Sequence, residues 1–472
     1  MKRFKIFIAS IASVSAVMAS DITLKPGELE GIINGSGLTG QNELQIEGSI
    51  DARDFAAMEK LPKEIKELDL TNVSIEKLTM TSRKYFGKTL FNAGELPGYS
   101  FFKSGVERIL LPSSTTSIGE GSFSGSSLKS IVIPEGVESI GAYAFYGCED
   151  LETVTLPASL KSIGKGAFGN CRSLRAINLT GTAITEIPEK AFSGCLQLSS
   201  LSLPASVRKI GKEAFSHTKL EQLSLSSVTE FEPFALSGMA FLEKLTLNPQ
   251  ADIEEGLLMD DISLISLTGI PQYLPDYFAA NCLELPTEEV IGNIVSLGNY
   301  SLANNSAPER LILDDSLTSI GRGAFSGLTT ISKIDATSLG DNVPEVQDNS
   351  FEGITPGDIK LYVTDKSYDK WASDPVWSQF ILTKSSTTGL DSEEALADNG
   401  ISISLRGGLL TVESPTELTA VSIYAPDGML LNSATPHQTR FEIPASELGS
   451  GIVIVKAMNS EKETRTLSIM LK

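Results

Sequence analysis

A short motif recurs along the chain at an almost constant interval, and this repetition constrains the fold more than any other feature of the sequence. SIGAYAFYGCEDLETVTLP, residues 139–157, is followed by its near copy SIGKGAFGNCRSLRAINLT, residues 162–180. The phenylalanine of the motif recurs in steps of 22, 23, 24 and 23 residues, at Phe123, Phe145, Phe168, Phe192 and Phe215. Such a period is typical of solenoids, in which stacked units bury an apolar face that no single unit can bury alone.

Weaker copies of the motif extend the array in both directions. We assign the same position of the motif to Phe101, Phe234, Phe278, Phe325 and Phe351, and the segments EEGLLMD near Leu257 and NYSLANN near Leu302 fill the two wide gaps. The array then contains about eleven coils between roughly residues 95 and 365. Within one copy, LETVTLP (151–157) alternates apolar and polar residues, which predicts a short half-buried strand ended by Pro157.

The motif resembles the BspA-like class of leucine-rich repeats found in exported bacterial proteins, whose units read I-x-x-I-G-x-x-A-F-x-x-C-x-x-L-x-x-I-x-I-P. Copies at 137–157, 160–179 and 207–225 match closely, whereas those from 228 to 310 depart from the pattern, so we expect curvature to be least regular there. The resemblance implies a repeat solenoid of short parallel strands with turns and short helical segments, acting in adhesion or ligand binding at or outside the cell envelope.

The N-terminus has the pattern of a secretory signal peptide. MKRFK supplies positive charge, IFIASIASVSAVM is an apolar stretch short for a membrane span, and Val17 to Ala19 provide the small residues of a cleavage site. We predict cleavage after Ala19, with a membrane anchor as the alternative. Since Ser20 rather than cysteine would begin the mature chain, a lipid anchor is disfavoured. We expect an exported protein, at the cell surface, the outer membrane or outside the cell, with no membrane insertion after cleavage.

The C-terminal part of the chain changes character twice. LYVTDKSYDKWASDPVWSQF (361–380) contains both tryptophans and predicts a strand and an aromatic helix that cap the array, with an aromatic sugar platform as the alternative. TKSSTTGLDSEEALADNG (383–400) is polar and predicts a linker. Beyond it, alternating segments predict a small all-β sandwich. The predicted division of the chain is a signal peptide (1–19), an N-terminal cap with degenerate repeats (20–95), a solenoid (96–382) with its cap (361–382), a linker (383–400) and a β-sandwich (401–472).

The β-sandwich resembles the C-terminal sorting module of type IX-secreted proteins. VSIYAPDGMLL and LGSGIVIVKA carry the resemblance, although Val453 stands where that family usually has tyrosine. A sorting signal and a plain accessory domain both remain open.

The four cysteines occupy one position of the motif, at Cys148, Cys171, Cys195 and Cys282. In leucine-rich repeats this position takes asparagine or cysteine, whose side chain lies inside and bonds the backbone. Stacked side chains point the same way, which is poor disulfide geometry, so buried free thiols are favoured over disulfides. A metal site is disfavoured because the only histidines, His217 and His437, lack metal-like spacing.

Neither charge nor motifs indicate catalysis or a nucleic-acid partner. The net charge of −21 disfavours nucleic acid and anionic membranes as general partners. A catalytic triad would need His217, which is expected in a surface turn. Acidic pairs are expected in solvated turns, at Glu149/Asp150, Glu254/Glu255, Asp260/Asp261 and Asp314/Asp315. We therefore predict no enzyme activity, no cofactor and no metal.

The expected binding surface is the outward side of the repeat strands. The alternation places small, mostly hydroxylic side chains there, and the candidate ligand-binding residues are Thr153, Thr155, Asn178, Ser200, Ser202, Gln222, Ser224, Lys244 and Thr246. Hot-spot residue types are scarce in this row. We expect an extracellular protein or polysaccharide as the partner. The alternatives are an envelope scaffold without a soluble ligand and, less favoured, a glycan-active enzyme.

Overall fold

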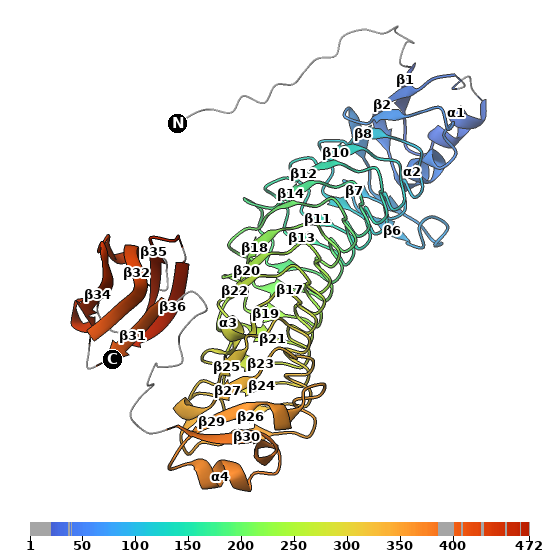
Figure 1. The fold of residues 1–472 in the computed structure, drawn as a ribbon. Coiled ribbons are helices and arrows are strands. Elements are labelled where there is room, and N and C mark those ends of the chain that lie inside the picture. The colour runs from blue at the N-terminus through green and yellow to red at the C-terminus, as the bar shows by residue number, and fades with distance from the viewer. Residues whose placement is uncertain are drawn as a thin grey trace. The chain divides into compact units, whose positions relative to one another are not determined.

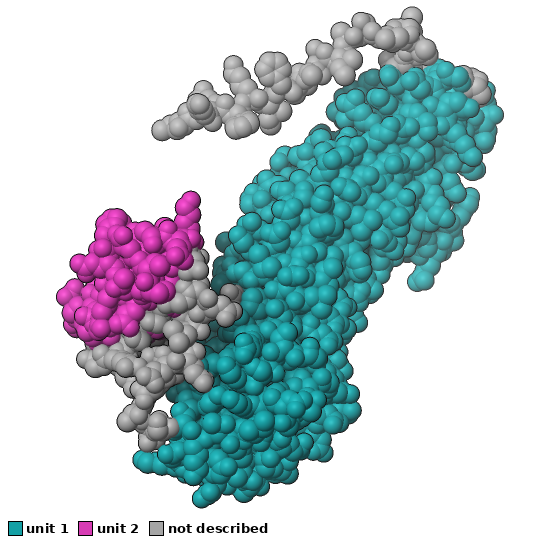
Figure 2. Space-filling view, viewed as in Figure 1, with its two compact units in different colours: residues 1–385 teal, residues 386–472 magenta. Residues whose placement is uncertain are grey.

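A computed structural model describes residues 20–35, 38, 40–385, 401–406, 409–425, 429–448, 451–462 and 464–471. The chain divides into two compact units, residues 1–385 and 386–472 (Figure 2). The predicted signal peptide and residues 386–400 of the predicted linker lie outside the described residues.

Unit 1 is a solenoid whose coils contribute strands to two parallel rows (Figure 1). The first row consists mostly of three-residue strands, β8 (Arg108–Leu110), β10 (Ser130–Val132), β12 (Thr153–Thr155), β14 (Ala176–Asn178), β16 (Ser200–Ser202), β18 (Gln222–Ser224), β20 (Lys244–Thr246), β22 (Ser266–Thr268), β25 (Arg310–Ile312), β27 (Lys333–Asp335), β29 (Lys360–Thr364) and β30 (Ile381–Ser385). The second row consists of two-residue strands, β7 (Glu95–Leu96), β9 (Ser117–Ile118), β11 (Ser139–Ile140), β13 (Ser162–Ile163), β15 (Glu186–Ile187), β17 (Lys209–Ile210), β19 (Glu230–Phe231), β21 (Asp252–Ile253), β23 (Tyr273–Leu274), β24 (Ser296–Leu297), β26 (Ser319–Ile320) and β28 (Glu345–Val346). The predicted solenoid of short parallel strands is confirmed.

The repeated phenylalanine forms a continuous column inside the solenoid. Neighbouring rings lie 5.1 to 5.8 Å apart between centroids and within 7° of parallel, in the order Phe101, Phe123, Phe145, Phe168, Phe192 and Phe215. The backbones of neighbouring coils also lie close together at the recurring glycine of the motif. A Cβ on Gly164 would lie 2.3 Å from the Ala142 backbone nitrogen, so only glycine fits at this position.

Two of the predicted column positions are wrong. The backbone N–H of each column residue donates to the carbonyl of the residue just before the next column residue, as Phe145 does to Ala167. By the same hydrogen bonds the column continues after Phe215 through Leu236, Leu258 and Ala279. Leu258 lies in the segment predicted near Leu257, whereas Phe234 and Phe278 are not in the column. The prediction followed the aromatic residue, but in these coils the inner position holds a smaller apolar side chain.

The N-terminal cap extends the first row of strands. It contains β1 (Ser20–Leu24), α1 (Leu29–Gly35), β2 (Glu43–Ile50), α2 (Ala52–Met58), β3 (Glu67–Asp69) and β4 (Val73–Ile75). Helix α2 begins with a capping box formed by Asp51 and Asp54. Strands β1, β2 and β3 join β8, β10, β12, β14 and β16 in one sheet, with β4 paired to β2. A hairpin of β5 (Leu78–Thr79) and β6 (Leu90–Phe91) follows the cap.

The coils that depart from the motif are held by polar ladders. Helix α3 (Thr287–Ile291) lies between β22 and β25 along the chain, where the other coils place a first-row strand (Figure 1). Asn304 Nδ2 donates to Asn281 Oδ1 at 2.9 Å, and Asn281 Nδ2 donates to Asp260 Oδ1 at 2.8 Å. All three residues have positive φ, which asparagine and aspartate tolerate better than most residues. Side-chain hydrogen bonds therefore connect these coils where the motif is weak.

An aromatic cluster closes the C-terminal end of the solenoid. It is built on α4 (Tyr368–Ser373) and three short 3-10 helices, Thr337–Leu339, Pro356–Asp358 and Trp377–Gln379. Trp371 and Trp377 are fully buried, and their ring N–H groups donate to the carbonyls of Gly340 and Pro344. This cluster lies where the cap was predicted, and because both rings are buried, neither offers a face to a sugar. Strand β30 adds one strand beyond the cap and runs to Ser385, so 383–385 belong to this strand rather than to a linker.

Unit 2 is a small antiparallel β-domain. Its elements are β31 (Ser402–Arg406), β32 (Leu409–Tyr424), β33 (Leu430–Ala434), β34 (Gln438–Pro444), a 3-10 helix (Ala445–Glu447), β35 (Gly451–Asn459) and β36 (Thr464–Leu471). The first half of β32 pairs with β31 and with most of β34. The second half of β32 pairs with β33 and β35. Side chains from both halves, including Val412 and Ile423, share one buried cluster. The predicted all-β C-terminal domain is confirmed.

Candidate ligand-binding face

The candidate residues lie on the outer surface of the first row, which we call the sheet face. In β12, β14, β16, β18 and β20 the middle residue is buried or half-buried, and the two flanking residues point outward. Eight of the candidates are exposed and Thr246 is half-buried. The period-2 alternation of a strand explains why these positions were accessible to sequence reasoning.

The structure brings the candidates together in two groups. Ala176 and Asn178 pair with Ser200 and Ser202, and Thr153 pairs with Ala176, within the nine-stranded sheet. The remaining four candidates lie on the three-stranded sheet of β18, β20 and β22, where Gln222 and Ser224 pair with Lys244 and Thr246. The coils remain stacked between the two sheets, because Phe192 and Phe215 pack at 5.8 Å.

The candidate side chains are polar, and lysine is the only charged type among them. Asn178 Oδ1 accepts hydrogen bonds from the Thr180 backbone N–H and hydroxyl, at 3.0 and 2.6 Å. Thr268 Oγ1 donates to Thr246 Oγ1 at 3.1 Å, so neighbouring hydroxyls bond along the row. The face can therefore offer hydroxyl and amide groups to a polar ligand at the spacing of adjacent strands, roughly 4.8 Å.

Sequence reasoning missed two extensions of this face. Ser266 and Thr268 continue it on β22, and the alternation in LISLTG (264–269) would have found them. At the other end, residues of β2, β3 and β8 line a surface depression of about 140 Å³. The lining consists of the outward Glu43, Gln45, Glu67, Asp69, Arg108 and Leu110, with the buried Leu44 and Leu68 between them. The Arg108 Nη1 atom lies 3.5 Å from Glu67 Oε2. The alternation of apolar and polar residues in ELQIEG (43–48) and KELDLT (66–71) would have predicted these outward positions.

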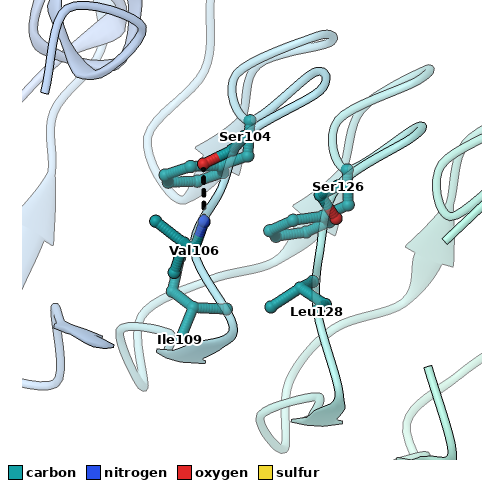
Figure 3. Close-up of a pocket in the computed structure, with 7 residues that line it drawn as sticks. Ser104, Val106, Ile109, Ser126 and Leu128 are labelled. Atoms are coloured by element: carbon teal, nitrogen blue, oxygen red, sulfur yellow. Dashed lines mark hydrogen bonds between the residues drawn. The ribbon is translucent and has the colours of Figure 1, made fainter. Parts of the chain in front are cut away.

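A second hollow lies inside the solenoid and has no room for a ligand (Figure 3). Ser104 and Ser126 occupy the position that cysteine takes in later coils, and the smaller serine leaves a gap beside Phe101 and Phe123. The accessible volume of this gap is about 0 Å³. The Val106 backbone N–H donates to Ser104 Oγ at 3.3 Å, so the serine hydroxyl is used locally.

All four cysteines are buried free thiols, as predicted. Each Sγ donates to a backbone carbonyl of the preceding coil at 3.0 to 3.1 Å, as Cys148 does to Phe123 and Cys282 to Leu258. Burial raises the pKa of Cys148 to about 11 and that of Cys195 to about 12. A thiol held in its neutral form is a poor nucleophile and a poor metal ligand. The cysteines fill space and satisfy the backbone.

The expectation that Asp261 lies in a solvated turn is wrong. Asp261 occupies the cysteine position and is fully buried, and its Oδ1 accepts from the Met239 backbone N–H at 2.7 Å. Its Oδ2 has no hydrogen-bond partner. Burial raises the pKa of this carboxyl well above its ordinary value. The neighbouring Asp260 is exposed, as predicted for the turn.

The structure adds no catalytic constellation within the described residues. His217 is exposed in a turn with positive φ, and His437 lies in unit 2 with its Nδ1 2.8 Å from Glu417 Oε1. Among the described residues, no group of three or more His, Cys, Asp or Glu side chains is arranged to hold a metal ion.

Comparison with known families decides the identity of the repeat. The model described as "BspA type Leucine rich repeat region (6 copies)" matches residues 94–187, 180–271 and 262–356, together more than half of the chain. The chain belongs to the BspA-type leucine-rich repeat family. The family match begins at residue 94, directly after the β5–β6 hairpin of this BspA-type chain.

One of three similar solved structures supports the same fold. A leucine-rich repeat protein from Bacteroides ovatus is 20% identical with a TM-score of 0.53, and the match covers 78% of this chain and 91% of that chain. A leucine-rich cell surface protein from Faecalibacterium prausnitzii is 18% identical with a TM-score of 0.39, covering 69% and 89%. The pneumococcal vaccine antigen PcpA is 14% identical with a TM-score of 0.29, covering 78% and 83%. The first of these shows a shared fold.

A search of curated proteins found no match. In the part of the chain that the structure describes, none of the helices has the length and apolarity needed to cross a membrane.

Proposed function

We propose that this BspA-type chain is an exported protein that binds an extracellular protein or a polysaccharide through its sheet face, at the cell surface or outside the cell. The observation that carries the proposal is the row of exposed hydroxyl and amide side chains on successive first-row strands. A repeated row of donors and acceptors matches an extended polymer better than a compact molecule, since each repeat of the ligand meets the same groups.

The chemistry of the face supports binding through many weak hydrogen bonds. Serine, threonine and asparagine side chains donate and accept, and exposed groups lose little solvation when a polar ligand replaces water. The depression at the N-terminal end of the sheet face has a volume of about 140 Å³, which is small beside the concave, mostly apolar sites that hold small molecules. We infer binding rather than catalysis for the same reason.

The test is a binding screen of the chain from residue 20 onward, against a glycan array and a panel of extracellular-matrix proteins. The variant Thr155→Arg/Ser202→Arg/Ser224→Arg places three bulky cations on the sheet face and should abolish a saturable interaction. The matched control makes the same substitution at three exposed residues near the second row, Ser162, Thr185 and Thr229. Unchanged binding by the sheet-face variant would refute the proposal. A folded chain that binds nothing in either panel would favour the envelope scaffold.

We further propose that residues 401–472 direct export as a sorting module of the type IX kind. The support is the resemblance in VSIYAPDGMLL and LGSGIVIVKA and the folding of this segment as a separate unit. Val453, which replaces the family's tyrosine, is buried, so the substitution changes the core of the module rather than its surface. Deleting 401–472 in a host with this secretion system should retain the chain inside the cell. Normal release of the truncated chain would leave the module as an accessory domain.

A further inference from the structure

One coil of unit 1 carries an insertion that the rest of the array lacks. Glu67 and its neighbour in the sheet, Arg108, are separated by 41 residues, whereas Arg108 and its next neighbour, Ser130, are separated by 22. The additional residues form the β5–β6 hairpin, which projects from the side of the coils next to the β6 label (Figure 1). Insertions in solenoids form loops on one side, and these loops often carry binding function.

The inserted segment has a charge opposite to that of the chain. Residues 77–94 contain four basic residues, Lys77, Arg83, Lys84 and Lys88, and no aspartate or glutamate. The whole chain has a net charge of −21. A cluster of one sign on a projecting element of an otherwise oppositely charged protein concentrates an attractive potential there.

The tip of the hairpin has a defined conformation. Phe86 and Gly87 both have positive φ, at 48° and 67°, and the Lys88 backbone N–H donates to the Tyr85 carbonyl at 3.1 Å. This geometry fits the two-residue type I′ turn of hairpins. The Phe86 ring packs edge-on against Phe91 at 6.1 Å, which holds the tip against the hairpin stem.

Three of the four cations form no ion pair. Lys88 is paired with Glu95, whereas Lys77, Arg83 and Lys84 have no ion-pair partner among the described residues. All three of these side chains are exposed. Lys84 lies in the neighbourhood of Glu30, because its charge, after that of Lys60, helps to lower the pKa of that carboxyl. Lys84 Nζ lies 5.0 Å from the centroid of the Tyr85 ring, so an aromatic face lies directly beside the free charge.

We propose that the β5–β6 hairpin binds an anionic polysaccharide, through contacts of Arg83 and Lys84 with its sulfate or carboxylate groups. Tyr85 supplies an aromatic ring at the same place, and aromatic rings commonly pack against sugar rings. Broad anionic surfaces such as membranes or duplex nucleic acid meet repulsion from the acidic body of the chain. Phe86 packs against the core of unit 1, so the tip is held on the coils, and a single polysaccharide strand is thin enough to contact the exposed Arg83 and Lys84 there. This surface is separate from the sheet face and its function is independent of it.

The experiment measures binding of the full chain from residue 20 to three immobilised polymers, in low and in moderate salt. Dextran sulfate tests sulfate recognition, polygalacturonate tests carboxylate recognition, and unmodified dextran is the uncharged reference. The expected result is binding to at least one anionic polymer and not to dextran, weakening as salt rises. Arg83→Glu/Lys84→Glu should weaken this binding by about tenfold or more, because two attractions become two repulsions. The matched control, Arg322→Glu/Lys366→Glu, makes the same change in net charge at exposed positions of other coils and should bind as the unmodified chain does.

Three results of the binding measurement would overturn the proposal. They are equal binding to dextran and to both anionic polymers, equal loss of binding in the two charge-reversed variants, and no binding to any of the polymers. Sedimentation of the same samples identifies the competing occupant. Self-association that disappears only in Arg83→Glu/Lys84→Glu would assign the hairpin to the acidic surface of a second copy and refute the polysaccharide. Circular dichroism of both variants confirms that they are folded.

Discussion

The buried carboxyl of Asp261 leads to a prediction that runs against the usual effect of altering a core residue. We expect Asp261→Asn to stabilise the folded chain at neutral pH. Asp261 is fully buried, one of its oxygens has no hydrogen-bond partner, and burial raises its pKa well above the ordinary value of 3.8. Asn305 occupies the equivalent position two coils later, where its Oδ1 accepts from the Cys282 backbone N–H at 3.0 Å. An asparagine side chain can therefore occupy this position of the coil, although the buried Asn305 Nδ2, like Asp261 Oδ2, has no hydrogen-bond partner.

The size of the effect follows from proton linkage. A carboxyl with a raised pKa stays protonated in the folded chain after it has ionised in the unfolded chain, so folding takes up a proton. The free energy of unfolding then falls as pH rises above the ordinary pKa, by up to about 1.4 kcal/mol per pH unit, until the folded-state pKa is reached. Asparagine has no proton to exchange and removes this loss. The two proteins should therefore be nearly equal in stability near pH 4 and diverge as pH rises.

The assay is urea denaturation of both proteins at several values between pH 4 and pH 8. The matched control is Asp150→Asn, which removes one carboxylate from an exposed turn. The reasoning fails if Asp261→Asn is destabilising by a constant amount at every pH, since that would show an ionised carboxylate held by favourable contacts. It also fails if the control reproduces the same dependence on pH.

Three further predictions follow from the packing of unit 1. The four thiols should be unreactive toward a thiol reagent at pH 7 and should all react in denaturant, because burial raises the pKa of Cys148 to about 11 and that of Cys195 to about 12; fewer than four reactive thiols after unfolding would indicate a disulfide. Gly164→Ala should destabilise the coil by about 1–3 kcal/mol, since its Cβ would lie 2.3 Å from the Ala142 nitrogen, and denaturant unfolding with an unchanged midpoint would contradict this close approach. Trp377→Ala should lower stability by about 3–5 kcal/mol through loss of a fully buried ring in the cap, measured by thermal unfolding; an effect below 1 kcal/mol would show that the cap is not needed.

The motif predicted the parts of the fold that depend on local pattern. The alternation in each copy predicted which side chains point outward from β12 to β20, and the repeated cysteine predicted a buried, unpaired thiol. The tryptophans predicted large buried rings at the end of the array, because such rings cover an exposed core. These side-chain positions could be predicted because each depends on the pattern within a single coil.

The predictions failed in the weak copies of the motif, where more than one residue could take the inner position of the coil. Phe234 and Phe278 carried the expected ring, but Leu236 and Ala279 take the column position in the structure. Asp261 belongs to an acidic pair of the kind found in turns, but the register of its coil places its side chain in the core of the solenoid. The register of a weak copy is decided by which side chains fit between the coils before and after it, and this information is not local.

By itself, the sequence of this chain determined a solenoid with a period of about 23 residues, a polar outer row and a separate β-domain, because periodic apolar positions can be buried only by stacking. Only the tertiary structure decided that Asp261 is buried, that α3 stands between β22 and β25, and that the basic segment from 77 to 94 forms a projecting hairpin. The physical reason is the same in each case. Burial and projection are properties of a residue's neighbours in space, and in this array those neighbours lie about one coil away along the chain.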